Sequence, residues 1–299
     1  MNEQLLQTLV SGVAVGSTYS MIALGFVLVF SATKILNFAQ GAFVVLGAYL
    51  TYQFATKWGV PFPLAVILAV IVCAGLSILF ERVVVRRIPP ANNFAAIMIT
   101  GGALFSTEAI VSTIWGVYPL NLGDPWGLET VDFFGAKVAV VSIWTIAISG
   151  GLLIATFLVF KFTRAGLAMR AAVNDPLAAT ASGISLKNVR LGVWGAAGAA
   201  GGVAGMLMAT GATGLSPGLG TAAFVALPAM VLGGLDSPLG AIIGGLVMGL
   251  VQQLAVLYQP EYLPFLGNGF PAVTPYLVLV LVLLFKPAGL LGTKRVGRF

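Results

Sequence analysis

Two side-chain amides stand beside a glycine between long apolar runs of this sequence. Asn37 and Gln40 precede Gly41 within the stretch SATKILNFAQGAF, which spans residues 31–43. This stretch is polar enough to break a helix, and non-helical backbone at membrane depth is tolerated only inside protein or along a water-filled cavity. Two interpretations follow. Either the amides belong to a broken helix that lines a pathway, or they lie in a short turn at the cytoplasmic membrane surface.

An acidic side chain lies inside another apolar run. Glu108 falls within residues 94–116, where Thr100 is also found. An ionisable group at membrane depth is costly and is by default a functional candidate. The alternative is a position near the outer interface, because the run ends by Gly116. A single acid without a partner in another apolar run argues against a proton pump.

A second interruption occurs in the later half of the chain. The stretch ATGLSPGLGTAAF spans 212–224, and Pro217 and Gly218 break the helical pattern there. A pair of Gly/Pro-interrupted segments at corresponding positions of two halves is a pointer to a binding or gating region. The predicted pathway residues are therefore Asn37, Gln40, Gly41, Thr100, Glu108, Pro217 and Gly218.

Composition places the chain in a membrane. Of its 299 residues, 59% are hydrophobic and 8% are charged, whereas soluble domains carry about 25% charged residues. There is no histidine, and Cys73 is the single cysteine. Histidine proton relays, histidine metal sites and an intrachain disulfide are thereby excluded, and no metal-binding spacing is present.

Apolar runs long enough to cross a bilayer recur along the chain. Nine candidates lie near residues 5–30, 39–56, 61–80, 94–116, 138–160, 190–212, 222–235, 238–258 and 272–287. The fold class is therefore an all-α polytopic membrane protein with eight or nine transmembrane helices. The seventh and ninth runs are short enough to be broken or re-entrant segments.

Loop charges predict the orientation. The loops 81–93 and 161–189 are basic, whereas 118–137 and 259–271 are acidic. Lys and Arg accumulate on the cytoplasmic side, so the net charge of +6 indicates topology and not nucleic-acid binding. The N-terminus is expected outside and the C-terminus inside. The basic residues of the C-terminal tail agree; they are Lys294, Arg295 and Arg298.

One apolar phrase occurs twice. AFVVLGAYL at 42–50 returns as AFVALPAMV at 223–231, with an offset of 181 residues. We interpret 1–299 as one transmembrane domain with a first repeat at 1–116 and a second at 190–287. The span 138–160 links them, and this odd span inverts the second copy, giving a 4+1+4 arrangement of inverted repeats of the kind found in transporters. The alternative is chance similarity between apolar segments.

The connection 161–189 is predicted to fold as two short cytoplasmic helices. Asn174 or Asp175 caps the second helix, with Pro176 in its first turn. Gly183 suits the left-handed stop. The Ala-rich faces of these helices favour a docking surface for a cytoplasmic partner over a solvated connector.

Four stretches together resemble the permeases of branched-chain amino-acid ABC importers, in particular the smaller, LivH-like subunit. They are NFAQGAFVVLGAY, ERVVVRR, TRAGLAMRAAVNDPLAATASGIS and VLGGLDSPLGAIIGGLVMGLVQQL. Gln40 and Ala42 stand where the family motif usually has His and Glu. The resemblance implies a permease subunit of an ATP-driven importer for branched-chain or other amino acids in a bacterial cytoplasmic membrane. A permease for urea or short amides, and an ATP-independent channel or facilitator, are the alternatives.

The resemblance also implies partners. They are a second, LivM-like permease, two cytoplasmic ATP-binding subunits and an extracytoplasmic solute-binding protein. The chain has no phosphate-binding loop sequence, so ATP and Mg would be used by the partner ATPases, and the chain is expected to be neither an enzyme nor a cofactor-binding protein. The implied ATPase-coupling residues lie in 164–185; they are Arg164, Gly166, Arg170, Asp175, Pro176 and Gly183. The second-half motif corresponds to Gly233, Gly234, Asp236 and Gly240.

Overall fold

The computed structural model describes most of the chain. The described residues are 2–89, 92–123, 125–126, 129–133, 135–210, 214–267 and 269–292. Four charged residues used in the orientation argument lie outside them: Asp124, Lys294, Arg295 and Arg298.

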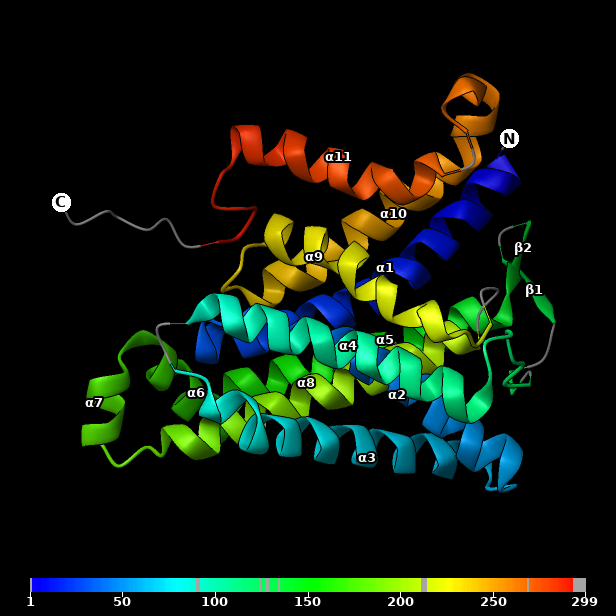
Figure 1. The fold of residues 1–299 in the computed structure, drawn as a ribbon. Helices are drawn as coiled ribbons and strands as arrows, with labels where there is room; N and C mark the ends of the chain where they lie inside the picture. Colours follow the sequence, from blue (N-terminus) through cyan, green and yellow to red (C-terminus); the bar gives the residue numbers. More distant parts are fainter. Residues whose placement is uncertain are drawn as a thin grey trace.

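The fold is helical (Figure 1). The helices are α1 (Asn2–Thr33), α2 (Gln40–Tyr52), α3 (Phe62–Val83), α4 (Asn93–Trp115), α5 (Val140–Phe162), α6 (Arg164–Asn174), α7 (Pro176–Ala181), α8 (Leu186–Ala209), α9 (Ala222–Gly233), α10 (Pro238–Tyr262) and α11 (Phe270–Phe285). A π turn at Gln53–Lys57 continues α2, and short 3-10 turns occur at Val85–Arg87, Pro217–Thr221 and Pro264–Leu266.

Each predicted apolar run lies mainly on a helix. Among the described residues, six helices are long and apolar enough to cross a membrane: α1, α3, α4, α5, α8 and α10. The apolar helices α9 and α11 are shorter, as expected for the seventh and ninth runs. The all-α polytopic class is confirmed.

The predicted linking span begins too early. Residues 138–139 belong to a hairpin of β1 (Thr130–Phe133) and β2 (Ala136–Ala139), in which Thr130 pairs with Ala139. The backbone of Ala139 is extended, and α5 begins at Val140. Residues 138–139 are apolar like the helix that follows, so the apolar pattern does not separate them from it. The strand pairing that keeps them out of the helix depends on residues elsewhere in the chain.

The centre of the bundle is formed by α1 and α8. In the apolar stretch of α1, 83% of residues are buried, and in that of α8, 72%, against 22% or less in α3, α4 and α5. A small residue allows α1 to pack closely on α10, because a Cβ added at Gly16 would lie 2.8 Å from the Cα of Leu246 on α10. Close backbone approach through glycine is a common way for helices to associate in lipid.

The helix contacts follow an exchange pattern between the two halves. α1 packs on α10, and α8 packs on α3; α2 packs on α8, and α9 packs on α1. Likewise α2 contacts α3 and α4, while α9 contacts α10 and α11. Each of these contacts therefore has a counterpart in the other half. The counterpart is found by pairing α1 with α8, α2 with α9, α3 with α10 and α4 with α11. The division into repeats is itself a prediction, and such an exchange is what two similar halves would produce.

Candidate functional site

The chain folds back into the bundle after α1. Lys34, directly after this helix, has a positive φ of 58°, and α2 begins at Gln40. The side chain of Gln40 lies against Gly25, eight residues before the end of α1, and a helix rises 1.5 Å per residue. Gln40 therefore contacts α1 about 12 Å along the helix axis from the end of α1, which favours the broken helix over the surface turn.

Gln40 also fixes α2 to the central helix α8. Its Nε2 donates to the carbonyl oxygen of Ala197 at 3.0 Å. Gln40 is fully buried, so this hydrogen bond forms away from water. The start of α2 is thereby held at mid-height on α8.

The two interrupted segments meet each other. The 3-10 turn Pro217–Thr221 leads into α9, and a Cβ added at Gly41 would lie 2.6 Å from the carbonyl oxygen of Gly220 and 3.2 Å from the Cβ of Ala223. The rings of Phe38 and Phe224 are 5.8 Å apart. α2 and α9 are therefore half-helices whose N-terminal ends touch, a contact that only glycine at position 41 accommodates without displacement.

Thr100 on α4 holds the first interrupted segment. Its Oγ1 accepts from the backbone N–H of Phe38 at 3.2 Å and lies 3.4 Å from the carbonyl oxygen of Leu36. The same hydroxyl is 2.9 Å from the carbonyl oxygen of Ala96. Thr100 is fully buried. Its hydroxyl therefore takes the place of water as the hydrogen-bond partner of the Phe38 N–H, where the chain is not helical.

Several polar atoms are buried without a partner near the junction of α2 and α9, the place where Gly41 meets Gly220. Within the described residues, both amide atoms of Asn37 and the Oε1 of Gln40 have no hydrogen bond. The Oε1 of Glu108 is also buried and unpaired, and it lies 2.7 Å from the position that a Cβ at Gly220 would take. Leaving such an atom unsatisfied costs roughly 1–3 kcal/mol. The junction therefore holds several polar atoms whose hydrogen bonds the described residues do not supply.

The other two predicted pathway residues play a different part. Gly218 is exposed, and a Cβ added there would meet nothing within 4 Å, while Pro217 is half-buried. Thr221 Oγ1 donates to the carbonyl oxygen of Gly218 at 2.7 Å. Pro217 and Gly218 thus shape the turn that delivers Gly220 to the junction.

The predicted coupling segment forms two short helices. Thr163 caps α6 by accepting from the N–H of Gly166 at 3.2 Å. Gly166 lies against the backbone of Phe160, with no room for a side chain, and Arg170 donates to the carbonyl oxygen of Phe160. Gly166 and Arg170 therefore fix α6 against the end of α5, while Arg164 is the first residue of α6.

The cap and the stop of α7 are as predicted. Of the two candidate caps, Asp175 is the one used: its Oδ1 accepts from the N–H groups of Leu177 and Ala178, both at 3.0 Å. Pro176 is the first residue of α7, and Gly183 has a φ of 81°. Leu177 is 83% exposed, which leaves an apolar side chain uncovered on this short helix.

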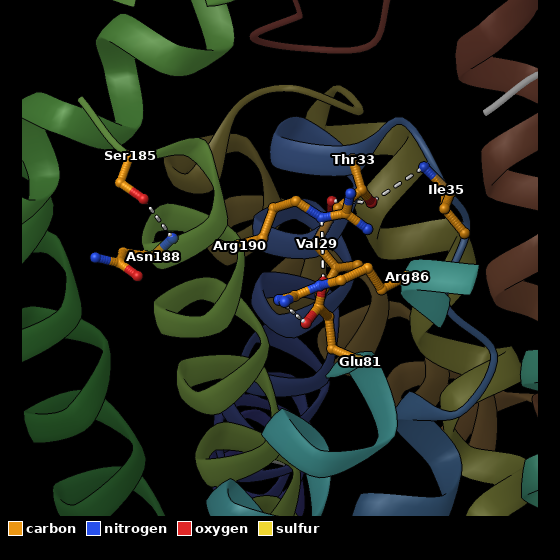
Figure 2. A network of polar contacts seen from close by, with 8 residues as sticks. All are labelled: Val29, Thr33, Ile35, Glu81, Arg86, Ser185, Asn188 and Arg190. Carbon is orange, nitrogen blue, oxygen red and sulfur yellow. Dashed lines mark hydrogen bonds and ion pairs between the residues drawn. The ribbon is translucent and has the colours of Figure 1, made fainter. Parts of the chain in front are cut away.

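Sequence reasoning missed a buried ion-pair cluster between the end of α3 and α8 (Figure 2). Glu81, predicted to lie in a loop, is fully buried near the end of α3. Its two oxygens accept from Arg86 at 2.7 and 3.3 Å, and the Nε of Arg190 on α8 lies 3.3 Å from its Oε1. The contact with Arg190 is an ion pair without hydrogen-bond geometry. The sequence did contain a signal for this cluster: Glu81 is the single acidic residue of a segment that carries several arginines.

One member of the cluster, Arg190, lies on the helix that runs between the two candidate regions. α8 begins at Leu186, shortly after α7, and carries both Arg190 and the Ala197 carbonyl that binds Gln40. α8 is therefore one continuous helix that contacts both Glu81 of α3 and Gln40 of α2.

Long apolar helices with two half-helices meeting among buried polar side chains define a polytopic membrane permease. Comparison with known proteins specifies its family. Residues 8–286 match the family described as "Branched-chain amino acid transport system / permease component", and the chain belongs to this family. It is a transport subunit and not an enzyme.

Individual relatives extend over the whole chain. The "High-affinity branched-chain amino acid transport system permease protein LivH" of Salmonella typhimurium is 28% identical and is covered, like this chain, over 100% of its length. The corresponding protein BraD of Pseudomonas aeruginosa is 27% identical, with 98% of this chain and 97% of BraD covered. Among solved structures, "PsaBC from Streptococcus pneumoniae in complex with Fab" aligns with a TM-score of 0.49 and 13% identity, covering 94% of this chain and 90% of that one.

Proposed function

We propose that the chain is the transmembrane permease subunit of an ATP-driven importer of branched-chain amino acids. The family and the full-length relatives support this class of solute. The observation that carries the proposal is the contact of α2 with the segment leading into α9 at Gly41 and Gly220, beside the buried amides Asn37 and Gln40.

The two halves are inverted repeats in this proposal. Residues 1–116 form the first and 190–287 the second, and α5 links them. The exchange pattern of helix contacts supports this division, as does the meeting of one half-helix from each half. Substrate sites of such transporters lie near the repeat interface, where this junction is found.

The junction offers a separate partner to each part of an amino acid. The N-terminal ends of helices carry partial positive charge, so the ends of α2 and α9 suit the substrate carboxylate. Glu108 suits the ammonium group. Leu104 and Val45 both approach within 3.0 Å of a Cβ placed at Gly220, and such apolar side chains suit a branched aliphatic group.

The amides and the turn residues complete this pathway. Asn37 and Gln40 supply hydrogen-bonding groups, while Gly41 leaves space and Thr100 holds the broken segment. Pro217 and Gly218 set the path of the second segment. Together these are the groups that would contact or position a solute during passage.

The partners in this proposal are a second permease, two ATP-binding subunits and an extracytoplasmic solute-binding protein. ATP and Mg bind to the ATP-binding subunits. α6 and α7, within 161–189, receive the ATPase motion; the exposed Leu167 and Leu177 support a protein contact there. The permease lies in a bacterial cytoplasmic membrane with its N-terminus outside and its C-terminus inside, as the basic and acidic loops favour.

The pathway is tested by leucine uptake into liposomes that contain the assembled importer. Glu108→Gln removes the charge and keeps the shape, so uptake is expected to fall at least tenfold. Glu129→Gln, in an exposed acidic position, is the matched control. Uptake by Glu108→Gln equal to that of the control variant would refute the assigned role, and uptake without ATP would refute an ATP-driven importer.

Coupling is tested separately with Arg170→Glu. The substitution breaks the contact with the Phe160 carbonyl and loosens α6 from α5. We expect lower uptake and lower stimulated ATP hydrolysis, with normal membrane insertion. Normal stimulated ATP hydrolysis in this variant would contradict the coupling role.

A further inference from the structure

A cavity of about 440 Å³ lies between α1, α5, α6 and the start of α10. Its wall is mainly apolar, with Leu153 and Phe157 from α5, Leu239 and Ile242 from α10 and Leu24 from α1. None of the pathway residues lines it, so the cavity is separate from the junction of α2 and α9.

Charged groups gather where α5 ends. Lys161 and Arg170 line the cavity, together with Asp236. Two positive charges and one negative charge leave a net charge of +1. The Nζ of Lys161 lies 5.5 Å from the ring centre of Phe157, which keeps the ammonium group beside the apolar wall. A guanidinium has five N–H donors, and Arg170 uses one of its nitrogens for the Phe160 carbonyl.

An unpaired hydroxyl lies in the wall of the same cavity. Ser31 lines it and is only 6% exposed, and its Oγ has no hydrogen-bond partner among the described residues. Serine and threonine in helices usually donate to a carbonyl one turn earlier. Ser20 and Thr33 of α1 do so, both at 2.7 Å. Ser31 is therefore a buried donor at the cavity wall that has no partner among the described residues.

We propose that this cavity binds a singly anionic glycerophospholipid. The phosphate binds Lys161 and Arg170, and the Ser31 hydroxyl, once its side chain turns toward the cavity, donates to an ester or phosphate oxygen. One acyl chain packs on Leu153 and Phe157. Basic pockets between transmembrane helices are recognised sites for anionic headgroups, whereas a free phosphate would leave the apolar wall unused. The proposal requires only that the end of α5 lies at a membrane surface, so it does not depend on the solute or on the orientation.

The lipid would bridge two parts of the molecule. Lys161 lies near the end of α5 and Arg170 lies on α6, while Leu239 and Ile242 belong to α10. The bound lipid therefore connects the proposed coupling helix with a transmembrane helix of the second half. Importer activity is expected to depend on the anionic lipid content of the membrane.

The test measures lipid binding to the delipidated, assembled importer by native mass spectrometry. Phosphatidylglycerol, phosphatidylcholine and glycerol 3-phosphate are added separately. We expect phosphatidylglycerol to bind with preference over phosphatidylcholine, and glycerol 3-phosphate to compete weakly. Lys161→Gln should weaken phosphatidylglycerol binding about fivefold, since one lysine near an anionic surface contributes about 1 kcal/mol.

A second variant tests the apolar wall. Leu239→Trp fills the cavity and should abolish retention of phosphatidylglycerol, with elution from a sizing column unchanged. Lys187→Gln and Leu277→Trp alter exposed residues of the same types outside the cavity and serve as matched controls. Wild-type binding by both cavity variants, no preference for phosphatidylglycerol, or equal competition by glycerol 3-phosphate would each overturn the proposal.

Discussion

The buried cluster around Glu81 makes a quantitative prediction about stability. Arg86 and Arg190 both contact this carboxylate, and their side chains are 28% and 32% exposed while that of Glu81 is 0% exposed. Removing either arginine leaves one cation in place. Removing both leaves a buried carboxylate with no cation, so the double variant Arg86→Ala, Arg190→Ala should lose more stability than the two single variants together.

The magnitude follows from the distances. At an effective dielectric constant of about 20, unit charges 2.7 and 3.3 Å apart attract by about 6 and 5 kcal/mol before desolvation is counted. Desolvation offsets most of this, and loss of the partners of a buried charge costs about 3–5 kcal/mol. Each single variant should cost only about 1 kcal/mol, because the remaining arginine and water at the partly exposed sites compensate.

Cys73 supplies the assay. It is the only cysteine in the sequence and is buried, and its Sγ lies 3.3 Å from a Cβ placed at Gly202, at the interface of α3 with α8. A thiol-reactive fluorophore therefore reports the opening of the interface that Glu81 and Arg190 join. For a chain of this size, about 2 °C per kcal/mol predicts a melting temperature about 6–10 °C lower in the double variant.

Arg82→Ala is the matched control, because Arg82 is an exposed neighbour of Glu81 on α3. It should melt within about 1 °C of the wild type. Two results would refute the reasoning. One is a double variant that melts like this control, and the other is a double variant whose loss equals the sum of the two single losses.

Three further perturbations probe the junction and the coupling helices. Gly41→Ala should lower uptake at least tenfold, because the new Cβ would lie 2.6 Å from the Gly220 carbonyl oxygen. Gly75→Ala, whose new Cβ would meet nothing within 4 Å, should leave uptake unchanged. Equal uptake by the two variants would contradict the close contact at Gly41. Thr100→Val removes the acceptor for the Phe38 N–H and should cost about 1–3 kcal/mol, seen as faster hydrogen exchange at Phe38; unchanged exchange would be inconsistent with this hydrogen bond. Asp175→Ala removes two capping hydrogen bonds and should destabilise α7 by about 1 kcal/mol, measured as lower stimulated ATP hydrolysis with an unchanged Cys73 melting temperature; normal hydrolysis would count against the role of α7.

Local signals predicted much of the helical structure. The cap at Asp175, the first-turn position of Pro176 and the left-handed Gly183 were all expected, because each depends on the backbone geometry of a few neighbouring residues. A break at Asn37 and Gln40 was also expected, since polar residues and glycine interrupt an apolar helix locally. The pairing of β1 with β2 was not, because strand pairing depends on a partner segment and leaves little apolar pattern in so short a stretch.

The sequence by itself determined that the chain lies in a membrane, which segments form apolar helices, and to which family the chain is similar. These properties depend on composition, on runs of neighbouring residues and on motif order. Only the tertiary structure decided that Gly41 meets Gly220, that Gln40 binds the Ala197 carbonyl and that Glu81 is buried between two arginines. Most of those contacts join residues more than a hundred positions apart, and their existence depends on how helices pack through small residues. Packing of this kind follows from the whole bundle and is not encoded in any single stretch of the chain.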